Sequence, residues 1–346
     1  MSRFRPILER YVSGYLEEVT ALSYGQLADY QSPPFATLAC GAAGIAYALW
    51  RAGRRDRSLL AAARRWTDEA LAGCTREDAF VGGGIEAEHT QSSLFYGPAG
   101  LDLCDALISQ ATGDEARAQQ ALGRFAVHAR AAGPVELMMG GAGFLSGASL
   151  LAAWLPAAGE LEGALMESLA AAARDALEDP GMAHGDAGLL FASLHAAQRR
   201  GRSVPRAVRA CLDRLATLTT RLDPPDGRWC NGSAGYALLF AKAHEVTGEA
   251  ELATVAHRAA LDALDSANGI PDLCCGAVGS AYAMLALSRI DPGGDWRRRA
   301  EELAMAVMVS EIQPEWAHGL FKGEAGTFCL AMDLLSGETR FPCLEA

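Results

Sequence analysis

The sequence predicts an all-α protein, a closed double-layered α/α barrel (toroid) of seven helical hairpins whose G-x-x-G loops gather at one mouth. Three observations lead to this prediction. A G-x-x-G motif followed by an apolar run occurs seven times along the chain. The segments around the motifs carry apolar residues at helical spacing, whereas alternating runs of β-branched residues are scarce. The chain has 346 residues, 50% of them apolar, which is enough to bury such a core.

After a first interval of 56 residues, the motifs follow one another at intervals of 43–47 residues. A unit of about 45 residues is the length of two helices of three to four turns with their connections. One G-x-x-G would be a weak signal, but seven at nearly constant spacing indicate a repeat architecture. Glycine suits such a loop because it permits positive φ and close backbone approach. In chain order the motifs are "CGAAGIAYALW" at Gly41, "YGPAGLDLCDAL" at Gly97, "MGGAGFLSGASLL" at Gly140, "HGDAGLLFASL" at Gly185, "NGSAGYALLF" at Gly232, "CGAVGSAYAML" at Gly276 and "KGEAGTFCLAMDLL" at Gly323.

Two kinds of helical segment alternate within the repeat. The runs that follow the glycines are apolar nearly all round, which is typical of inner, fully buried helices. The segments between them, such as "EARAQQALGRFAVHARAAG", keep a charged face and are expected to form an outer layer of about seven more helices. An open solenoid needs polar end caps, but the first and last repeats are as apolar as the middle ones. Residues 1–346 are therefore predicted to close into one toroidal domain.

One uncharged stretch, Leu137 to Gly159, is long enough to span a bilayer. It contains "GGAG" near its start and Pro156 near its end, with many alanines and glycines. We interpret it as a tight loop followed by a buried helix, so no integral membrane span is expected.

Charge and cysteine content limit the function classes. The formal net charge of -12 makes nucleic acid an unsuitable partner. The N-terminal "MSRFRPILERYVSGYLEEVT" has no apolar core of a signal peptide, so a cytoplasmic location is expected. The nine cysteines are an odd number in a long chain without a secretion signal. They favour metal binding or simple burial over a disulfide framework.

Four residues suited to metal or acid–base chemistry fall in two columns of the repeat. His184 and Cys275 directly precede the first glycine of their motifs, and Cys230 and Cys274 stand one residue earlier. They belong to the fourth, fifth and sixth repeats, so a closed ring would bring them together at the mouth. Three thiols at one point suit Zn²⁺, which binds thiolates tetrahedrally at about 2.3 Å. The alternatives are burial of small apolar side chains and a disulfide between Cys274 and Cys275.

Two other features receive a structural interpretation. The motifs at Gly41, Gly97 and Gly323 are expected to be turns and packing points, with Cys40 a packing residue. His318, in "WAHGLFKG", repeats the A-H-G letters but lies outside the two columns.

At these loops the chain resembles the LanC-like lanthionine cyclases. The segments "GMAHGDAGLL", "RWCNGSAGYALL" and "DLCCGAVG" are similar to that family's A-H-G, W-C-x-G and C-[HC]-G loops. The final "RFPCLEA" is similar to its closing segment. The resemblance covers all seven repeats and is most specific in repeats four to six. It implies an α/α toroid with a zinc ion at one mouth. It also implies an enzyme that adds a peptide cysteine thiol to dehydroalanine or dehydrobutyrine.

The resemblance also implies the metal ligands and the acid. Cys230, Cys274 and Cys275 would bind zinc, with Cys275 at the place where many family members have histidine. His184 matches the A-H-G histidine and would protonate the enolate left after thiolate addition.

Three further residues have implied roles. Glu136, four residues before the first glycine of the third repeat, stands where the family usually has an acidic residue and would orient His184. Arg228 lies closer to the zinc cysteine than the family's arginine usually does, and it would polarise the acceptor carbonyl. Asn231 replaces the usual tyrosine; its amide would hydrogen-bond the enolate oxygen but could not act as an acid.

The predicted function is a zinc-dependent peptide cyclase that forms lanthionine or methyllanthionine rings in a dehydrated precursor peptide. A separate dehydratase would have to supply the dehydroamino acids. Three alternatives remain open. A LanC-like enzyme could instead add glutathione to dehydroamino acids in proteins, and a zinc-stabilised toroid could bind a peptide without catalysis. An α/α-barrel glycoside hydrolase would need paired carboxylates in the mouth.

Overall fold

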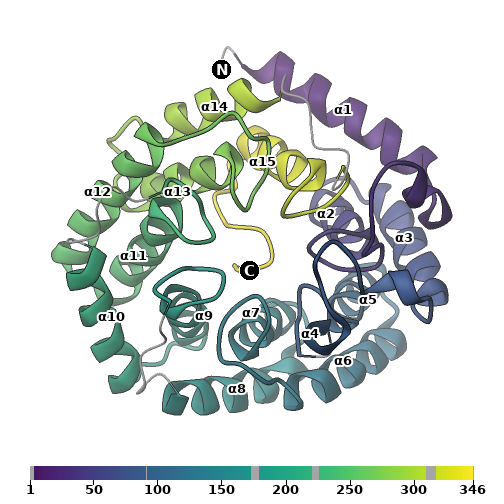
Figure 1. The fold of residues 1–346 in the computed structure, drawn as a ribbon, viewed down its shortest axis with the longest axis horizontal. Helices are drawn as coiled ribbons and strands as arrows, with labels where there is room; N and C mark the ends of the chain where they lie inside the picture. Colours follow the sequence, from purple (N-terminus) through teal and green to yellow (C-terminus); the bar gives the residue numbers. More distant parts are fainter. Residues whose placement is uncertain (1–3, 91, 173–178, 220–225, 309–316, 346) are drawn as a thin grey trace.

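The computed structural model shows a closed ring of helices in two concentric layers (Figure 1), which confirms the predicted α/α barrel. It describes residues 4–90, 92–172, 179–219, 226–308 and 317–345. Over these residues the chain forms helices joined by loops, and no extended strand is present. Fourteen long helices build the two layers, as the repeat length predicts.

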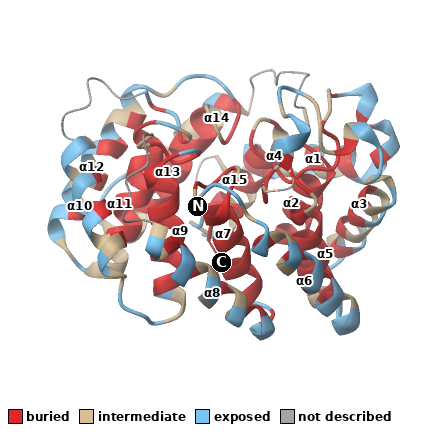
Figure 2. Ribbon diagram, turned by 60° about the horizontal axis from the view of Figure 1, so that its bottom comes forward, coloured by how far each residue is buried: buried red, intermediate tan, exposed pale blue. Residues whose placement is uncertain are grey.

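The inner layer consists of seven apolar helices, which Figure 2 shows as almost wholly buried. Six of them begin directly after the first glycine of a motif, and that glycine is the N-cap residue. The uncharged stretch from Leu137 to Gly159 thus contains a loop and one buried helix, followed by a short 3-10 turn. The inner helices are α2 (Ala42–Gly53), α5 (Ala99–Thr112), α7 (Gly141–Ala152), α9 (Asp186–Arg199), α11 (Ser233–Thr247), α13 (Ala277–Ile290) and α15 (Glu324–Ser336).

The outer layer is amphipathic, with one face on the inner helices and one exposed face. Short elements fill some connections: η1 (Tyr24–Asp29), η2 (Glu77–Ala79), α4 (Ala87–Thr90) and η3 (Pro156–Ala158). No helix in the described part of the chain combines the length and the apolar character that crossing a bilayer requires. The outer helices are α1 (Arg5–Ala21), α3 (Leu59–Gly73), α6 (Glu115–Arg130), α8 (Gly159–Ala172), α10 (Arg206–Thr219), α12 (Ala250–Asp265) and α14 (Trp296–Val307).

The seventh hairpin is made from the two ends of the chain. The N-terminal helix α1 packs against α15 and takes the outer position beside it (Figure 1). The inner helices α2 and α15 are also in contact, and the buried Arg51 on α2 forms a two-pronged ion pair with Asp333 on α15. The ring therefore closes through contacts between residues at opposite ends of the sequence.

The second glycine of each motif is required by close approach between repeats. A Cβ on Gly279 would lie 2.5 Å from the Leu273 carbonyl oxygen and 2.9 Å from Cβ of Trp229 in the preceding repeat. The second glycines of the other six motifs likewise face a carbonyl oxygen of their own loop and a side chain of the preceding repeat. No motif glycine has positive φ. Two reasons for glycine were expected at these positions. The expectation of close backbone approach is confirmed, and the expectation of positive φ is wrong.

Replacing Gly279 with alanine is expected to lower the free energy of unfolding by about 1–3 kcal/mol, because the methyl group would overpack the contact with Trp229. Gly123 provides a matched control, since it lies inside α6 with no atom within 4 Å of an added Cβ. Gly123→Ala is expected to stabilise the protein by up to about 1 kcal/mol through helix propensity. Denaturant midpoints measure both; equal changes in the two variants would contradict close packing at Gly279.

The closing segment, residues 341–345, lies inside the ring (Figure 1). Phe341 is fully buried and stacks on Trp229 with ring centroids 5.2 Å apart. Glu345 forms buried ion pairs with Lys242 at 2.6 Å and Arg289 at 3.2 Å. Because Trp229 directly precedes Cys230, the end of the chain supports the wall behind one of the candidate metal ligands.

Candidate metal centre

The glycine loops are joined by backbone hydrogen bonds at the residue two places before the first glycine of each motif. The Ala183 N–H donates to the Cys230 carbonyl at 2.8 Å, and the Cys230 N–H donates to the Cys274 carbonyl at 3.2 Å. The same bond links four further pairs, here written from donor to acceptor: Ala39 to Phe95, Met138 to Ala183, Cys274 to Phe321 and Phe321 to Ala39.

Between the second and third loops, the hydroxyl of Ser93 takes the place of the direct backbone hydrogen bond. There the Ser93 hydroxyl accepts from the Phe95 N–H at 3.1 Å and donates to the Met138 carbonyl at 2.5 Å. The bonds therefore run through all seven loops and hold this column at one level around the mouth. The repeat alignment alone, without any structural information, already places these residues in one column.

Three thiols meet in this circle. The Sγ atom of Cys275 lies 3.8 Å from that of Cys230 and 3.5 Å from that of Cys274. Tetrahedral zinc with sulfur at about 2.3 Å holds its sulfur ligands about 3.8 Å apart, so the donor set and its spacing suit this ion. The separations exclude a disulfide between Cys274 and Cys275, whose sulfurs would be about 2 Å apart.

The turn before Gly276 explains how adjacent cysteines face one point. The Asp272 carboxylate accepts the Cys275 N–H at 2.5 Å, and the Asn268 amide donates to the Cys275 carbonyl at 2.9 Å. Cys274 and Cys275 both lie before the first residue of α13. Adjacent side chains on a helix point in different directions, but in this turn the two thiols can point to one place. Hydrogen bonds from Cys230 and Cys274 lower the pKa of Cys275, and the Lys322 ammonium adds to the effect.

Lys322 is a site residue that the sequence reasoning missed. Its Nζ atom lies 2.8 Å from Cys275 Sγ and 3.9 Å from the Asp272 carboxylate. It directly precedes Gly323, so it shares the column of His184 and Cys275, although the seventh motif was expected to be only a turn. Thiol neighbours and burial raise the pKa of Cys274 in the same cluster. The column position was the available signal for Lys322.

His184 and Glu136 meet across two neighbouring loops. The Glu136 carboxylate lies 3.4 Å from His184 Nδ1, and the His184 side chain is 54% exposed at the mouth. Glu136 is held in place because it accepts the backbone N–H groups of Met138 at 2.7 Å and Met139 at 2.6 Å. Hydrogen bonding to Glu136 raises the pKa of His184 against the opposing effect of burial. The carboxylate thus fixes Nδ1 and leaves Nε2 as the other proton-carrying atom.

Arg228 and Asn231 flank Cys230 but differ in surroundings. Arg228 is exposed and forms an ion pair with Asp226, which also accepts its backbone N–H at 3.1 Å. Asn231 is exposed, and its Oδ1 atom lies over Gly181 in the His184 loop, 2.6 Å from where a Cβ would stand. Both side chains are at the mouth, while their catalytic roles stay predictions.

The other six cysteines are packing residues in this structure. Cys40, Cys104, Cys211, Cys329 and Cys343 are buried, Cys74 is half-buried, and all nine cysteines carry free thiols. The Cys104 thiol donates to the Ala43 carbonyl at 3.2 Å. Burial raises the pKa of Cys40 to about 12, so this thiol of the first repeat is protonated at neutral pH.

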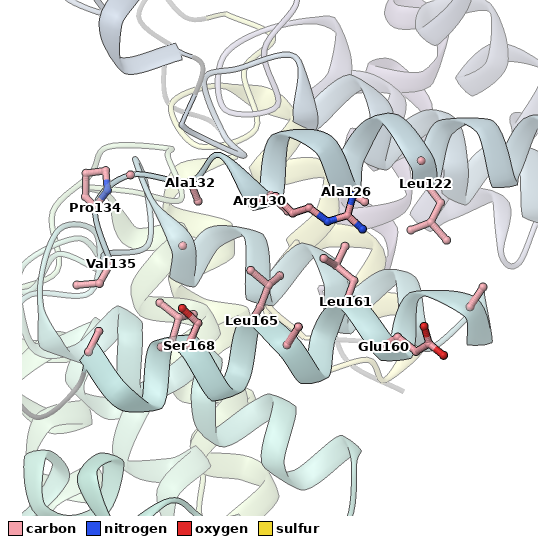
Figure 3. A pocket seen from close by; sticks show the side chains of 18 of the residues that line it. Leu122, Ala126, Arg130, Ala132, Pro134, Val135, Glu160, Leu161, Leu165 and Ser168 are labelled. Carbon is pink, nitrogen blue, oxygen red and sulfur yellow. The ribbon is translucent and has the colours of Figure 1, made fainter.

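A groove of about 730 Å³ lies on the outside of the ring, between α6 and α8 (Figure 3). Its walls are mostly apolar: Leu122 comes from α6 and Leu161 and Leu165 from α8, while Arg130 and Glu160 also line it. None of the seven candidate site residues lines it. The chemistry suggested by the loops is therefore at the mouth and not in this groove.

The comparisons with known proteins agree with this architecture. The family model described as "Lanthionine synthetase C-like protein" matches residues 35–346. Among solved structures, nisin cyclase superposes with a TM-score of 0.70 at 15% sequence identity. The match covers 98% of this chain and 96% of nisin cyclase. At this identity the superposition shows a common fold, and the family match covers every loop described above.

Proposed function

The chain belongs to the lanthionine synthetase C-like family of cyclases, and from this premise we propose that it closes thioether rings in a dehydrated precursor peptide. The observation that carries the proposal is the meeting of three thiols from two repeats at the mouth, 3.5 and 3.8 Å apart. Cys230, Cys274 and Cys275 would hold Zn²⁺ and leave a fourth position for a substrate thiol. When bound there, zinc would keep a cysteine of the peptide as a thiolate near neutral pH.

The proposed reaction is a redox-neutral addition. The peptide thiolate sulfur forms a bond to the β-carbon of dehydroalanine or dehydrobutyrine while the π pair moves to the acceptor carbonyl as an enolate. A proton then adds to the α-carbon and replaces the proton that the thiol lost. His184, exposed at the mouth and oriented by Glu136, is the proposed donor. Arg228 would polarise the acceptor carbonyl, and Asn231 would donate its amide to the enolate oxygen.

Lys322 is assigned a role in balancing charge. Three thiolates on Zn²⁺ carry a net charge of about -1, and a substrate thiolate would bring it to about -2. The Lys322 ammonium, 2.8 Å from Cys275 Sγ, offsets one of these negative charges and so favours binding of the substrate thiolate.

Replacing Lys322 with methionine is expected to raise the KM of the dehydrated peptide about tenfold, since a charge-assisted hydrogen bond is worth about 1.5–3 kcal/mol. Lys322→Arg keeps the charge and the donors and is expected to stay within about threefold of the wild type. Steady-state cyclisation kinetics measure the effect, with zinc content determined alongside. An unchanged KM in the methionine variant would contradict the charge-balancing role.

The pairing of His184 with Glu136 predicts a pH dependence. A raised pKa keeps the imidazolium form present to higher pH, so activity should be lost only as the pH rises through that raised value. Glu136→Gln removes the negative partner and should shift the alkaline limb of the kcat profile to lower pH, so the loss is larger at pH 8 than at pH 6. His184→Asn should instead lower kcat about 100-fold at both pH 6 and neutral pH and remove the alkaline limb, because no acid is left to titrate. A parallel drop at all pH values in Glu136→Gln would mean that the carboxylate only supports the loop.

The experiment that tests the function uses one dehydrated cysteine-containing peptide with and without glutathione. Ring closure without a mass change, detected by loss of reactivity toward a thiol-alkylating reagent, supports the cyclase. A product heavier by one glutathione would support the alternative in which the family fold adds glutathione to dehydroamino acids. Binding of the peptide with cyclisation at the uncatalysed rate would support a non-catalytic toroid. The thiols at the mouth also argue against a glycoside hydrolase, which needs two carboxylates about 5–9.5 Å apart there.

Two further properties belong to this proposal. Free thiolate ligands require a reducing compartment, which fits action in the cytoplasm beside a separate dehydratase that supplies the modified peptide. Residues 1–346 would act as one toroidal domain, because α1 from one end and the 341–345 segment from the other both complete the ring.

A further inference from the structure

A second group of metal-ligating side chains lies where the N-terminal helix meets the last inner helix. Glu18 on α1, His318 in the loop before α15 and Glu324 in the first turn of α15 each offer one ligand atom, and these atoms lie within 4.8 Å of one another. His318 Nε2 is 3.8 Å from a Glu18 carboxylate oxygen. The three residues come from the two ends of the sequence and share no residue with the thiol cluster.

Buried polar atoms at this seam lack hydrogen-bond partners among the residues that the structure describes. The His318 side chain is 2% exposed, and neither of its ring nitrogens makes a hydrogen bond within the described chain. The Tyr15 hydroxyl on α1 is buried as well, and it too has no hydrogen-bond partner among the described residues. Each such atom costs about 1–3 kcal/mol when it is left unsatisfied. A natural occupant of the seam is therefore a group that binds an imidazole nitrogen and oxygens together.

The charges point to a cation. Two carboxylates face a buried imidazole, and in the described chain no lysine or arginine forms an ion pair with Glu18 or Glu324. One imidazole with two carboxylates is a donor set for first-row divalent ions, whereas Ca²⁺ and Mg²⁺ prefer oxygen alone. Bonds of about 2.0–2.2 Å hold ligand atoms roughly 3–4 Å apart. His318 Nε2 and the Glu18 carboxylate, 3.8 Å apart, are already at such a separation, and the exposed Glu18 side chain can adjust to the third ligand.

We propose that Glu18, His318 and Glu324 form a second divalent-cation site, which takes a first-row ion such as Mn²⁺ or Zn²⁺ and clamps α1 onto the seventh repeat. The site would close the outer layer where the sequence has no covalent continuity. It would also fix the loop of residues 317–323, which contains His318 near its start and Lys322 near its end. This inference does not depend on the proposed cyclase activity.

The test uses Mn²⁺ alone, because thiolates prefer softer ions and carboxylates with imidazole suit Mn²⁺. The full chain is stripped with a chelator and titrated, and the free ion is followed by its electron paramagnetic resonance signal. One Mn²⁺ per chain is expected to bind saturably and to raise the melting temperature. Glu324→Gln should weaken binding at least tenfold, whereas Cys275→Ser should leave it unchanged.

Two surface variants keep the test valid if the buried positions fail to fold. Glu18→Gln removes a ligand from a side chain that is 43% exposed and should also weaken Mn²⁺ binding at least tenfold. Glu17→Gln, the exposed neighbour on the same helix, should leave it unchanged. Absence of saturable Mn²⁺ binding by the wild type, or equal affinity in Glu17→Gln and Glu18→Gln, would overturn the proposal.

Discussion

Cyclisation is expected to fall by about three orders of magnitude when Cys230 is replaced by alanine, and bound zinc is expected to fall from about one equivalent at the mouth to none. The reason is geometric: Cys230 is the only one of the three thiols supplied by the fifth repeat, and the remaining two come from adjacent residues of one turn. Two ligands cannot complete the three-thiol face that leaves one position for substrate, so several kcal/mol of thiolate activation are lost.

The measurement pairs the metal content of the purified chain with the mass and thiol reactivity of the peptide product. Cys74→Ala is the matched control, because Cys74 is a half-buried free thiol outside the cluster and should change neither quantity. Cyclisation at the wild-type rate by a zinc-free Cys230→Ala protein would remove the basis of the proposed function. Retained peptide binding in that variant would show that the lost activity is chemical.

Cys275 allows a finer test at the same centre. Cys275→His replaces a thiolate by a neutral ligand, so the centre becomes one unit less negative and its bound substrate thiolate less electron-rich. Ring closure should slow, while zinc stays bound. In this variant the Lys322 hydrogen bond loses its sulfur acceptor, so the effect is best read beside that of Lys322→Met.

The ring and its candidate centre were largely predictable because the repeat carries the geometry. Aligning the motifs places Cys230 and Cys274 in one column, and the backbone hydrogen bonds between loops follow that same column. Lys322 stands in the neighbouring column with Cys275. A lysine at that position does not by itself indicate a role at the site; the role follows from its distance of 2.8 Å to the Cys275 thiol. Residue type suggested the ligands, whereas only the three-dimensional structure reveals the counter-charge.

Features that join distant repeats were beyond the sequence pattern. The pairing of α1 with α15 joins the two ends of the chain, and no local periodicity marks an N-terminal helix as the partner of a C-terminal one. The same limit applies to His318, whose neighbours Glu18 and Glu324 lie on different helices. The reason for the second motif glycines was also undetermined, because close approach depends on the preceding repeat.

Closure of the ring by Arg51 and Asp333 predicts the largest stability effect. Arg51 donates to Asp333 through Nη2 at 2.8 Å and Nε at 3.2 Å, and the Tyr282 hydroxyl donates to the same carboxylate at 2.6 Å. The two charged side chains are 6% and 4% exposed. Asp333→Ala would leave the guanidinium charged and buried, which costs about 3–5 kcal/mol, or roughly 5 °C in melting temperature for a chain of this length.

Two companions separate ring closure from simple loss of an ion pair. Glu9→Ala removes a pair with Arg5 in which both side chains are about half exposed, and it should cost less than about 1 kcal/mol. The double variant Arg51→Met with Asp333→Leu leaves no unpaired charge and should recover most of the loss, because apolar replacements of buried pairs are often neutral or stabilising. If Asp333→Ala melted within about 1 °C of Glu9→Ala, the contact between the first and last inner helices would not be what holds the ring closed. If the double variant stayed as unstable as the single one, the hydrogen bond from Tyr282, and not the ion pair, would be the interaction that matters.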